Sequence, residues 1–127
     1  MCDDGMNTGL AKIRVKRAHE KPSPGDGFRV LVDRLWPRGL TKDLLRLNLW
    51  IKDIAPSHEL RRWFGHDPHK WHEFQRKYTA ELDANPTSVE TLLSCLQSES
   101  VVTLVFGSKE EKLNNAVALQ KYCKSIQ

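Results

Sequence analysis

The chain has 127 residues, of which 39% are hydrophobic and 28% are charged, and its formal net charge at pH 7 is +4. This length and composition are typical of one ordinary globular domain and exclude an intrinsically disordered chain. No apolar run approaches the roughly 20 residues that cross a bilayer. The three cysteines have no metal-type spacing, which argues against a disulfide framework and favours a cytoplasmic location.

Positive charge is concentrated in the first half of the chain. Residues 1–64 hold 13 Lys and Arg against 8 Asp and Glu, whereas residues 65–127 hold 7 against 8. A basic surface can attract nucleic acid, nucleotides or acidic metabolites. Residues 1–10 are acidic and lack the basic-then-apolar order of a signal peptide. We expect them to form a loosely ordered tail before a single α/β domain over residues 11–127.

The first two predicted elements are strands. Lys12 to Ala18 alternates apolar and basic residues, and Phe28 to Arg34 contains the apolar run VLV. The loop between them has nine residues rich in Pro and Gly, which is short for the crossover that neighbouring parallel strands need. The two strands therefore pair antiparallel or are not neighbours.

Residues 41–54 fit two different patterns. One apolar set has helical spacing: Leu47, Trp50, Ile51 and Ile54. A second set alternates as in a strand: Leu47, Leu49 and Ile51. The helical interpretation is favoured, and Pro56 is expected to end the segment.

Capping residues mark the next helices. Ser57 can cap a short helix that runs to Phe64 and ends at Gly65. The dipeptide at Asp67 and Pro68 opens a longer helix. That helix places four apolar residues on one face: Trp71, Phe74, Tyr78 and Leu82.

A further helix is predicted from Thr87, which would form a capping box with Glu90. Its apolar face consists of Val89, Leu92, Leu93 and Leu96.

The C-terminal part is predicted to form a buried strand and a final helix. Val101 to Phe106 is apolar almost throughout, as in a strand that is covered on both faces. The last helix has one apolar side: Ala116, Leu119, Cys123 and Ile126. Strands interleaved with helices predict a small layered α/β domain, with a short mixed or parallel sheet flanked by helices.

Polar residues follow two of these strands, where ligands gather in open α/β sheets. One strand tip carries Asp33, Arg34, Trp36 and Arg38, and the other carries Gly107, Ser108 and Lys109, with Asn114 at the start of the last helix. We expect both tips to form one pocket for a nucleotide or phosphorylated small molecule. Arginine and lysine would bind its charge, Ser108 and Asn114 would place it, and Asp33 would orient an arginine or accept a proton.

Arg61 is a further candidate for this pocket, because it follows the capped Ser57. Simpler alternatives remain open: Asp33 and Arg34 can form an internal ion pair, and the WPRG segment can be a packed turn. A nucleic-acid-binding module is another alternative, with Trp36 stacking on a base. A third is an interaction scaffold without catalysis, and the sequence leaves open whether the protein is an enzyme.

A metal site is not expected. His66, His69 and His72 lie close in sequence, but His66 precedes the helix cap and no further ligand has zinc spacing. They are interpreted as solvated residues at the start of a helix.

Three segments resemble the YeaO-like branch of the domain-of-unknown-function 488 family: DGFRVLVDRLWPRGL, LWIKDIAPSHELRRWFGHDPHKWHEFQRKYTAEL and VTLVFGSKEEKLNNAVAL. The resemblance implies a small cytoplasmic α/β protein without a settled activity, a metal or a cofactor. Where the family's last helix commonly opens with Asn-His, this chain has Asn114 and Asn115. An amide does not titrate near neutrality, so Asn115 cannot replace a histidine in proton transfer.

Overall fold

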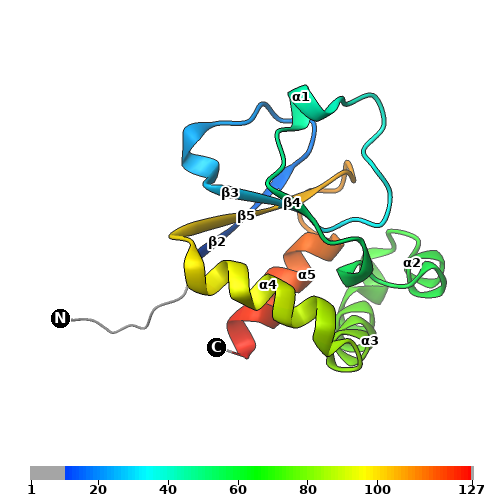
Figure 1. Cartoon of the computed structure of the whole chain (residues 1–127). Coiled ribbons are helices and arrows are strands. Elements are labelled where there is room, and N and C mark those ends of the chain that lie inside the picture. Colours follow the sequence, from blue (N-terminus) through cyan, green and yellow to red (C-terminus); the bar gives the residue numbers. More distant parts are fainter. Residues whose placement is uncertain (1–10, 127) are drawn as a thin grey trace.

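A computed structural model describes residues 11–126, so the predicted tail at residues 1–10 lies outside the described residues. In the described part, a parallel four-stranded sheet forms the centre of the molecule (Figure 1). Across the sheet the strands are β2 (Lys12–Arg17), β5 (Val101–Phe106), β3 (Phe28–Leu31) and β4 (Leu49–Trp50). The predicted α/β class is confirmed, and the sheet is parallel.

The first two predicted strands are not neighbours, because β5 lies between them. Leu104 of β5 is in register with Val15 of β2 on one side and with Val30 of β3 on the other. The connection from β2 to β3 passes through the short 3-10 turn η1 (Pro24–Asp26) and over the sheet face opposite the long helices (Figure 1). An extended chain spans roughly 3.3 Å per residue, so this short loop can return without a helix.

The long helices lie on one side of the sheet, and one short helix lies on the other (Figure 1). The first group contains α3 (Trp71–Asp83), α4 (Pro86–Ser98) and α5 (Asn115–Ser125). Helix α2 (His58–Phe64) packs beside α3, and the single turn α1 (Lys42–Leu45) covers the opposite face. None of the helices in the described residues has the length and apolar character of a membrane span.

Three predicted helix starts are confirmed, those at Ser57, Asp67 and Asn114, and one is wrong. The Ser57 hydroxyl caps α2 by accepting a hydrogen bond from Leu60 N–H, and Asp67 caps the 3-10 turn η3 (Pro68–Lys70) that leads into α3. Helix α4 begins at Pro86 rather than at the predicted Thr87 capping box. Proline suits a first helical position, where its missing N–H has no partner to lose.

The favoured helix over residues 41–54 is wrong. The segment contains only the turn α1, then β4, and then the 3-10 turn η2 (Lys52–Ile54). Arg46 ends α1 in a left-handed conformation with φ of 50°. The chain then pairs with β3, where Leu49 is in register with Val30. Tertiary pairing with an otherwise open sheet edge therefore outweighs the helical spacing of the apolar residues.

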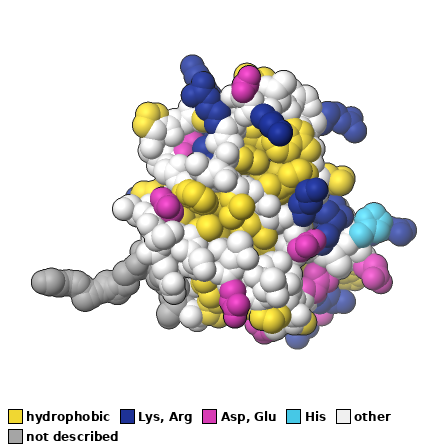
Figure 2. Space-filling view, viewed as in Figure 1, with side chains coloured by type: hydrophobic (Ala, Val, Ile, Leu, Met, Phe, Trp, Pro, Cys, Tyr) yellow, Lys and Arg dark blue, Asp and Glu magenta, His cyan; other side chains and the backbone are white. Residues whose placement is uncertain are grey.

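The sheet separates two apolar clusters of different size. The larger cluster lies under the long helices and includes the predicted α3 face: Trp71, Phe74, Tyr78 and Leu82. The smaller cluster on the other face contains four buried residues: Ala18, Leu31, Leu45 and Val105. β5 contributes to both clusters, as its apolar sequence predicts. On the face with α1, apolar side chains remain visible at the surface (Figure 2).

Candidate functional site

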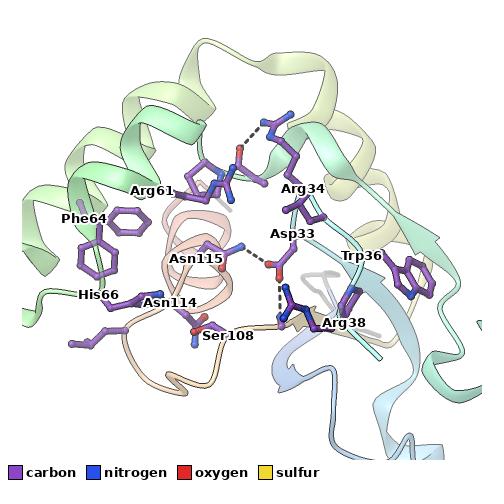
Figure 3. Close-up of a pocket in the computed structure, with 17 residues that line it drawn as sticks. Asp33, Arg34, Trp36, Arg38, Arg61, Phe64, His66, Ser108, Asn114 and Asn115 are labelled. Carbon is purple, nitrogen blue, oxygen red and sulfur yellow. Dashed lines mark hydrogen bonds between the residues drawn. The ribbon is translucent and has the colours of Figure 1, made fainter. Parts of the chain in front are cut away.

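The two predicted strand tips line one cavity. It has a volume of about 370 Å³ and opens where β3 and β5 end (Figure 3). Seven of the eight predicted binding or catalytic residues line it: Asp33, Arg34, Trp36, Arg38, Arg61, Ser108 and Asn114. Lys109 is exposed and is not among the lining residues. The β3–β5 pairing explains this proximity, because parallel neighbours end at the same edge of a sheet.

The Asp33 carboxylate lies near the centre of the cavity and accepts two hydrogen bonds (Figure 3). Gly107 N–H donates to Oδ2 at 2.8 Å, and the side-chain amide of Asn115 donates to Oδ1 at 3.0 Å. The same Asn115 nitrogen donates to the Val32 carbonyl at 3.2 Å. The Trp50 indole N–H donates to the Asp33 carbonyl at 2.7 Å. The carboxylate therefore links β3, β5 and α5, and its backbone is anchored to β4.

The surroundings of Asp33 disfavour its ionised form. Burial raises the pKa of Asp33, and the hydrogen bonds from Asn115 and Gly107 and the charge of Arg61 offset this only in part. No Lys or Arg nitrogen of residues 11–126 lies within 4.0 Å of the carboxylate. Asp33 and Arg34 thus do not form the internal ion pair that the sequence left open.

The three arginines of the cavity have few internal partners. Arg34 lies 3.4 Å from Asp53 Oδ1, and the Asp53 side chain is 82% exposed, so this ion pair is loose. Its other nitrogen donates to the Ala55 carbonyl at 3.4 Å. The guanidinium groups of Arg38 and Arg61 have no ion-pair partner among the described residues.

Arg61 extends from α2 toward the space between Arg34 and Asn115 (Figure 3). Its Nε atom is buried and has no hydrogen-bond acceptor among residues 11–126. A buried donor without an acceptor costs about 1–3 kcal/mol, so a molecule that enters the cavity and supplies an acceptor to Arg61 Nε would remove this cost.

Ser108 and Asn114 direct their side chains to the local backbone. The Ser108 hydroxyl accepts a hydrogen bond from Glu110 N–H at 3.0 Å. The Asn114 carbonyl oxygen caps α5 by accepting from Val117 N–H at 3.0 Å, and its amide donates to the Glu110 carbonyl. These residues shape the loop from β5 to α5, so their predicted contact with a ligand would add to a structural role.

Trp36 packs within the protein. Its ring meets that of Trp50 edge to face at a centroid distance of 5.4 Å. Its indole N–H donates to the Leu40 carbonyl at 2.6 Å. The Trp-Pro-Arg-Gly segment is therefore a packed turn as well as one wall of the cavity.

Much of the apolar wall and the contact between Asn115 and Asp33 were not predicted from the sequence. Phe64, Pro56 and Leu113 line the cavity, and Phe64 stacks on Phe74 at a centroid distance of 4.4 Å. The local sequence signal for Asn115 was its position directly after the helix cap Asn114. Its contact with Asp33, 82 residues away, follows only from the strand order.

The predicted histidine cluster does not assemble around one point. His66, His69 and His72 are all exposed, and only His66 lines the cavity. Within residues 11–126, no three His, Cys, Asp or Glu residues are arranged to hold a metal ion. Cys95 and Cys123 are free and buried.

Comparison with known proteins identifies similar chains of undetermined activity. An uncharacterized protein of Mycobacterium tuberculosis is 43% identical over 108 residues, covering 85% of this chain and 90% of the relative. The uncharacterized Escherichia coli protein YeaO is 35% identical over 114 residues, covering 90% of this chain and 98% of the relative. No solved structure matches the chain significantly.

A family model described as the inactive DUF488-N3 subclade matches residues 12–125. The match includes both strand tips, α2 and the start of α5, which together form the cavity. The resemblance noted in the sequence is thus confirmed across nearly the whole chain, and the protein belongs to the DUF488 family, which also includes YeaO-like proteins.

Proposed function

We propose that this protein binds a small anionic molecule, such as a nucleotide or phosphorylated metabolite, in the strand-tip cavity. The observation that carries the proposal is the lack of internal partners for its arginines. Arg38 and Arg61 have no ion pair within residues 11–126, and Arg34 has only a loose one. Guanidinium groups bind phosphate and carboxylate with two parallel hydrogen bonds.

The size of the cavity fits this class of ligand. About 370 Å³ is near the lower end of the roughly 300–1,000 Å³ that small-molecule sites occupy. Phe64, Pro56 and Leu113 supply an apolar part of the cavity lining. Such a site suits a compact molecule with one anionic group and one apolar part.

Binding without catalysis is the proposed role. The side-chain partner of Asp33 is Asn115, whose amide does not titrate near neutrality. Proton transfer at Asp33 would need a titratable partner such as histidine to carry the proton onward, and Asn115 occupies that place. The description of the matching subclade as inactive agrees with this proposal.

A thermal-shift experiment tests the proposal with inorganic phosphate, ribose 5-phosphate and nucleoside monophosphates. A ligand at ten times its Kd should raise the Tm by roughly 3–8 °C. Arg61→Gln should weaken binding at least tenfold. Arg62→Gln is the matched control, because Arg62 is the next residue of α2, is exposed and does not line the cavity. Equal binding by the two variants, or no stabilisation by any anion, would contradict the proposal.

A further inference from the structure

The proposed anion site contains a carboxylate that still has free acceptor positions. Asp33 lines the same cavity as Arg34, Arg38 and Arg61. An ionised carboxylate offers about four lone-pair positions, and each Asp33 oxygen is used by only one N–H donor in the described residues. Each oxygen can therefore accept one more hydrogen bond from a ligand.

A carboxylate beside a bound anion creates repulsion that the complex must remove. Like charges in one cavity disfavour each other, the more so when both are shielded from water. Two arrangements remove the repulsion: the ligand can place a hydrogen-bond donor against Asp33, or Asp33 can take up a proton when the ligand binds.

The contacts of Asp33 favour the first arrangement. Both of its partners, Gly107 N–H and the Asn115 amide, are donors, and these hydrogen bonds and the charge of Arg61 partly offset the burial that raises the pKa of Asp33. The Asn115 amide cannot reverse its donor role without losing its hydrogen bond to the Val32 carbonyl. The carboxylate is thus held in a setting that presents it as an acceptor.

We propose that the ligand is a nucleoside monophosphate whose base presents ring and amino N–H groups to Asp33, as guanine does, while its phosphate binds Arg61. This inference rests on the proposed function and narrows it to one ligand class. The flat base would lie against the apolar wall formed by Phe64, Pro56 and Leu113. A single phosphate is favoured over a triphosphate because the cavity holds only about 370 Å³.

Three nucleotides of nearly equal size test the inference on the unmodified protein. Guanosine monophosphate has two adjacent N–H groups on its base edge, inosine monophosphate has one, and adenosine monophosphate has a ring nitrogen acceptor at that position. Calorimetry should show guanosine monophosphate binding at least tenfold more tightly than adenosine monophosphate, with the inosine compound between them. Hydrogen bonds to charged acceptors justify a difference of this size.

Asp33→Asn should remove this preference and leave the three affinities within about threefold of one another. Asp43→Asn is the matched control, because Asp43 is exposed on α1 and does not line the cavity. Circular dichroism and urea unfolding would verify that both variants fold. If Asp33→Asn does not fold, the ranking of the three nucleotides on the unmodified protein still decides the question.

Other outcomes separate this inference from the proposed function. Equal binding of all three nucleotides, weakened by Arg61→Gln, would overturn the base preference and leave the anion site intact. Affinity that rises about tenfold for each unit of falling pH between pH 8 and 6, in the unmodified protein and in His66→Gln but not in Asp33→Asn, would show proton uptake by Asp33 and overturn the donor contact. Binding of ribose 5-phosphate without binding of any nucleotide would also overturn it. No binding of any of these probes would overturn both proposals.

Discussion

Two aspartates flank β3, and their environments act on them in opposite ways. Asp26 precedes the strand and is completely buried, whereas Asp33 follows the strand and lines the cavity. Burial acts to raise the pKa of Asp26, but hydrogen bonds from Ser23, Lys16 and Arg29 outweigh it and hold this pKa at about 2. Burial raises the pKa of Asp33, and its hydrogen bonds do not fully compensate.

The difference arises from the cations at each end of the strand. Lys16 and Arg29 lie 3.0 Å and 2.7 Å from the Asp26 carboxylate, and the Arg29 guanidinium also donates to the Leu45 carbonyl. The charges of Asp26, Lys16 and Arg29 are therefore paired with one another. At the other end, Arg61 lies near Asp33 without pairing with it. Asp26 therefore stabilises the fold, whereas Asp33 lines a cavity whose arginines have few ion-pair partners among the described residues.

Replacing each aspartate by asparagine should give the largest difference in the free energy of unfolding. Asp26→Asn leaves the buried Arg29 and the adjacent Lys16 without a counter-charge, so the free energy of unfolding should fall by about 3–5 kcal/mol. Asp33→Asn leaves no paired cation behind, but its NH2 group would face one of the two N–H donors, so the free energy of unfolding should fall by a smaller amount, about 1–2 kcal/mol. Urea unfolding at pH 7 measures both values, and similar losses would show that Asp33 is also a structural anchor.

The next largest difference in stability is expected for substitutions of two glycines. Gly27 follows Asp26 in the sequence, and Gly107 donates a hydrogen bond to Asp33. Gly27 has φ of 62°, and a Cβ there would lie 2.8 Å from Val101 Cβ. Gly27→Ala should therefore lower the free energy of unfolding by about 2–4 kcal/mol. At Gly107 an added Cβ would meet the Asp33 Oδ2 atom at 3.2 Å, which a small side-chain movement relieves. Gly107→Ala should cost less than about 1 kcal/mol, and a larger loss by this variant than by Gly27→Ala would reverse the comparison.

The pH dependence of stability should have opposite signs for the two aspartates. The folded-state pKa of Asp26 lies below its ordinary value of 3.8, so the unfolded chain binds the extra proton between these values and stability rises with pH. This contribution, about 2 kcal/mol, is fully present above roughly pH 4 and is lost toward pH 2. The pKa of Asp33 is raised, so the folded chain holds its proton longer.

For Asp33, stability is therefore highest below its ordinary pKa and falls as the pH rises through the raised value. Unfolding curves from pH 2.5 to 7 for the unmodified protein, Asp26→Asn and Asp33→Asn would measure both trends. The stability difference from Asp26→Asn should grow with pH, while that from Asp33→Asn should move in the opposite direction. Parallel curves would mean that the two carboxyl groups share one kind of environment.

Some features of the site were accessible from local sequence because they depend on neighbouring residues. Ser57 and Asn114 cap helices through contacts three residues away, and the polar residues after β3 follow directly from its apolar run. The segment at residues 41–54 misled the prediction because both periodicities were present. Residues 49–50 form a strand because they pair with the free edge of β3, and local sequence does not show which strand has a free edge.

The sequence by itself determined which segments are strands and helices at most positions, where several helices begin, and which residues follow the strands. These properties depend on side-chain periodicity and on hydrogen bonds within one turn. Only the tertiary structure decided that β5 lies between β2 and β3, which brings Gly107 and Asn115 to Asp33 and leaves Lys109 outside the cavity. Contacts across 74 and 82 residues depend on strand order, and strand order is set by how all the apolar faces pack together.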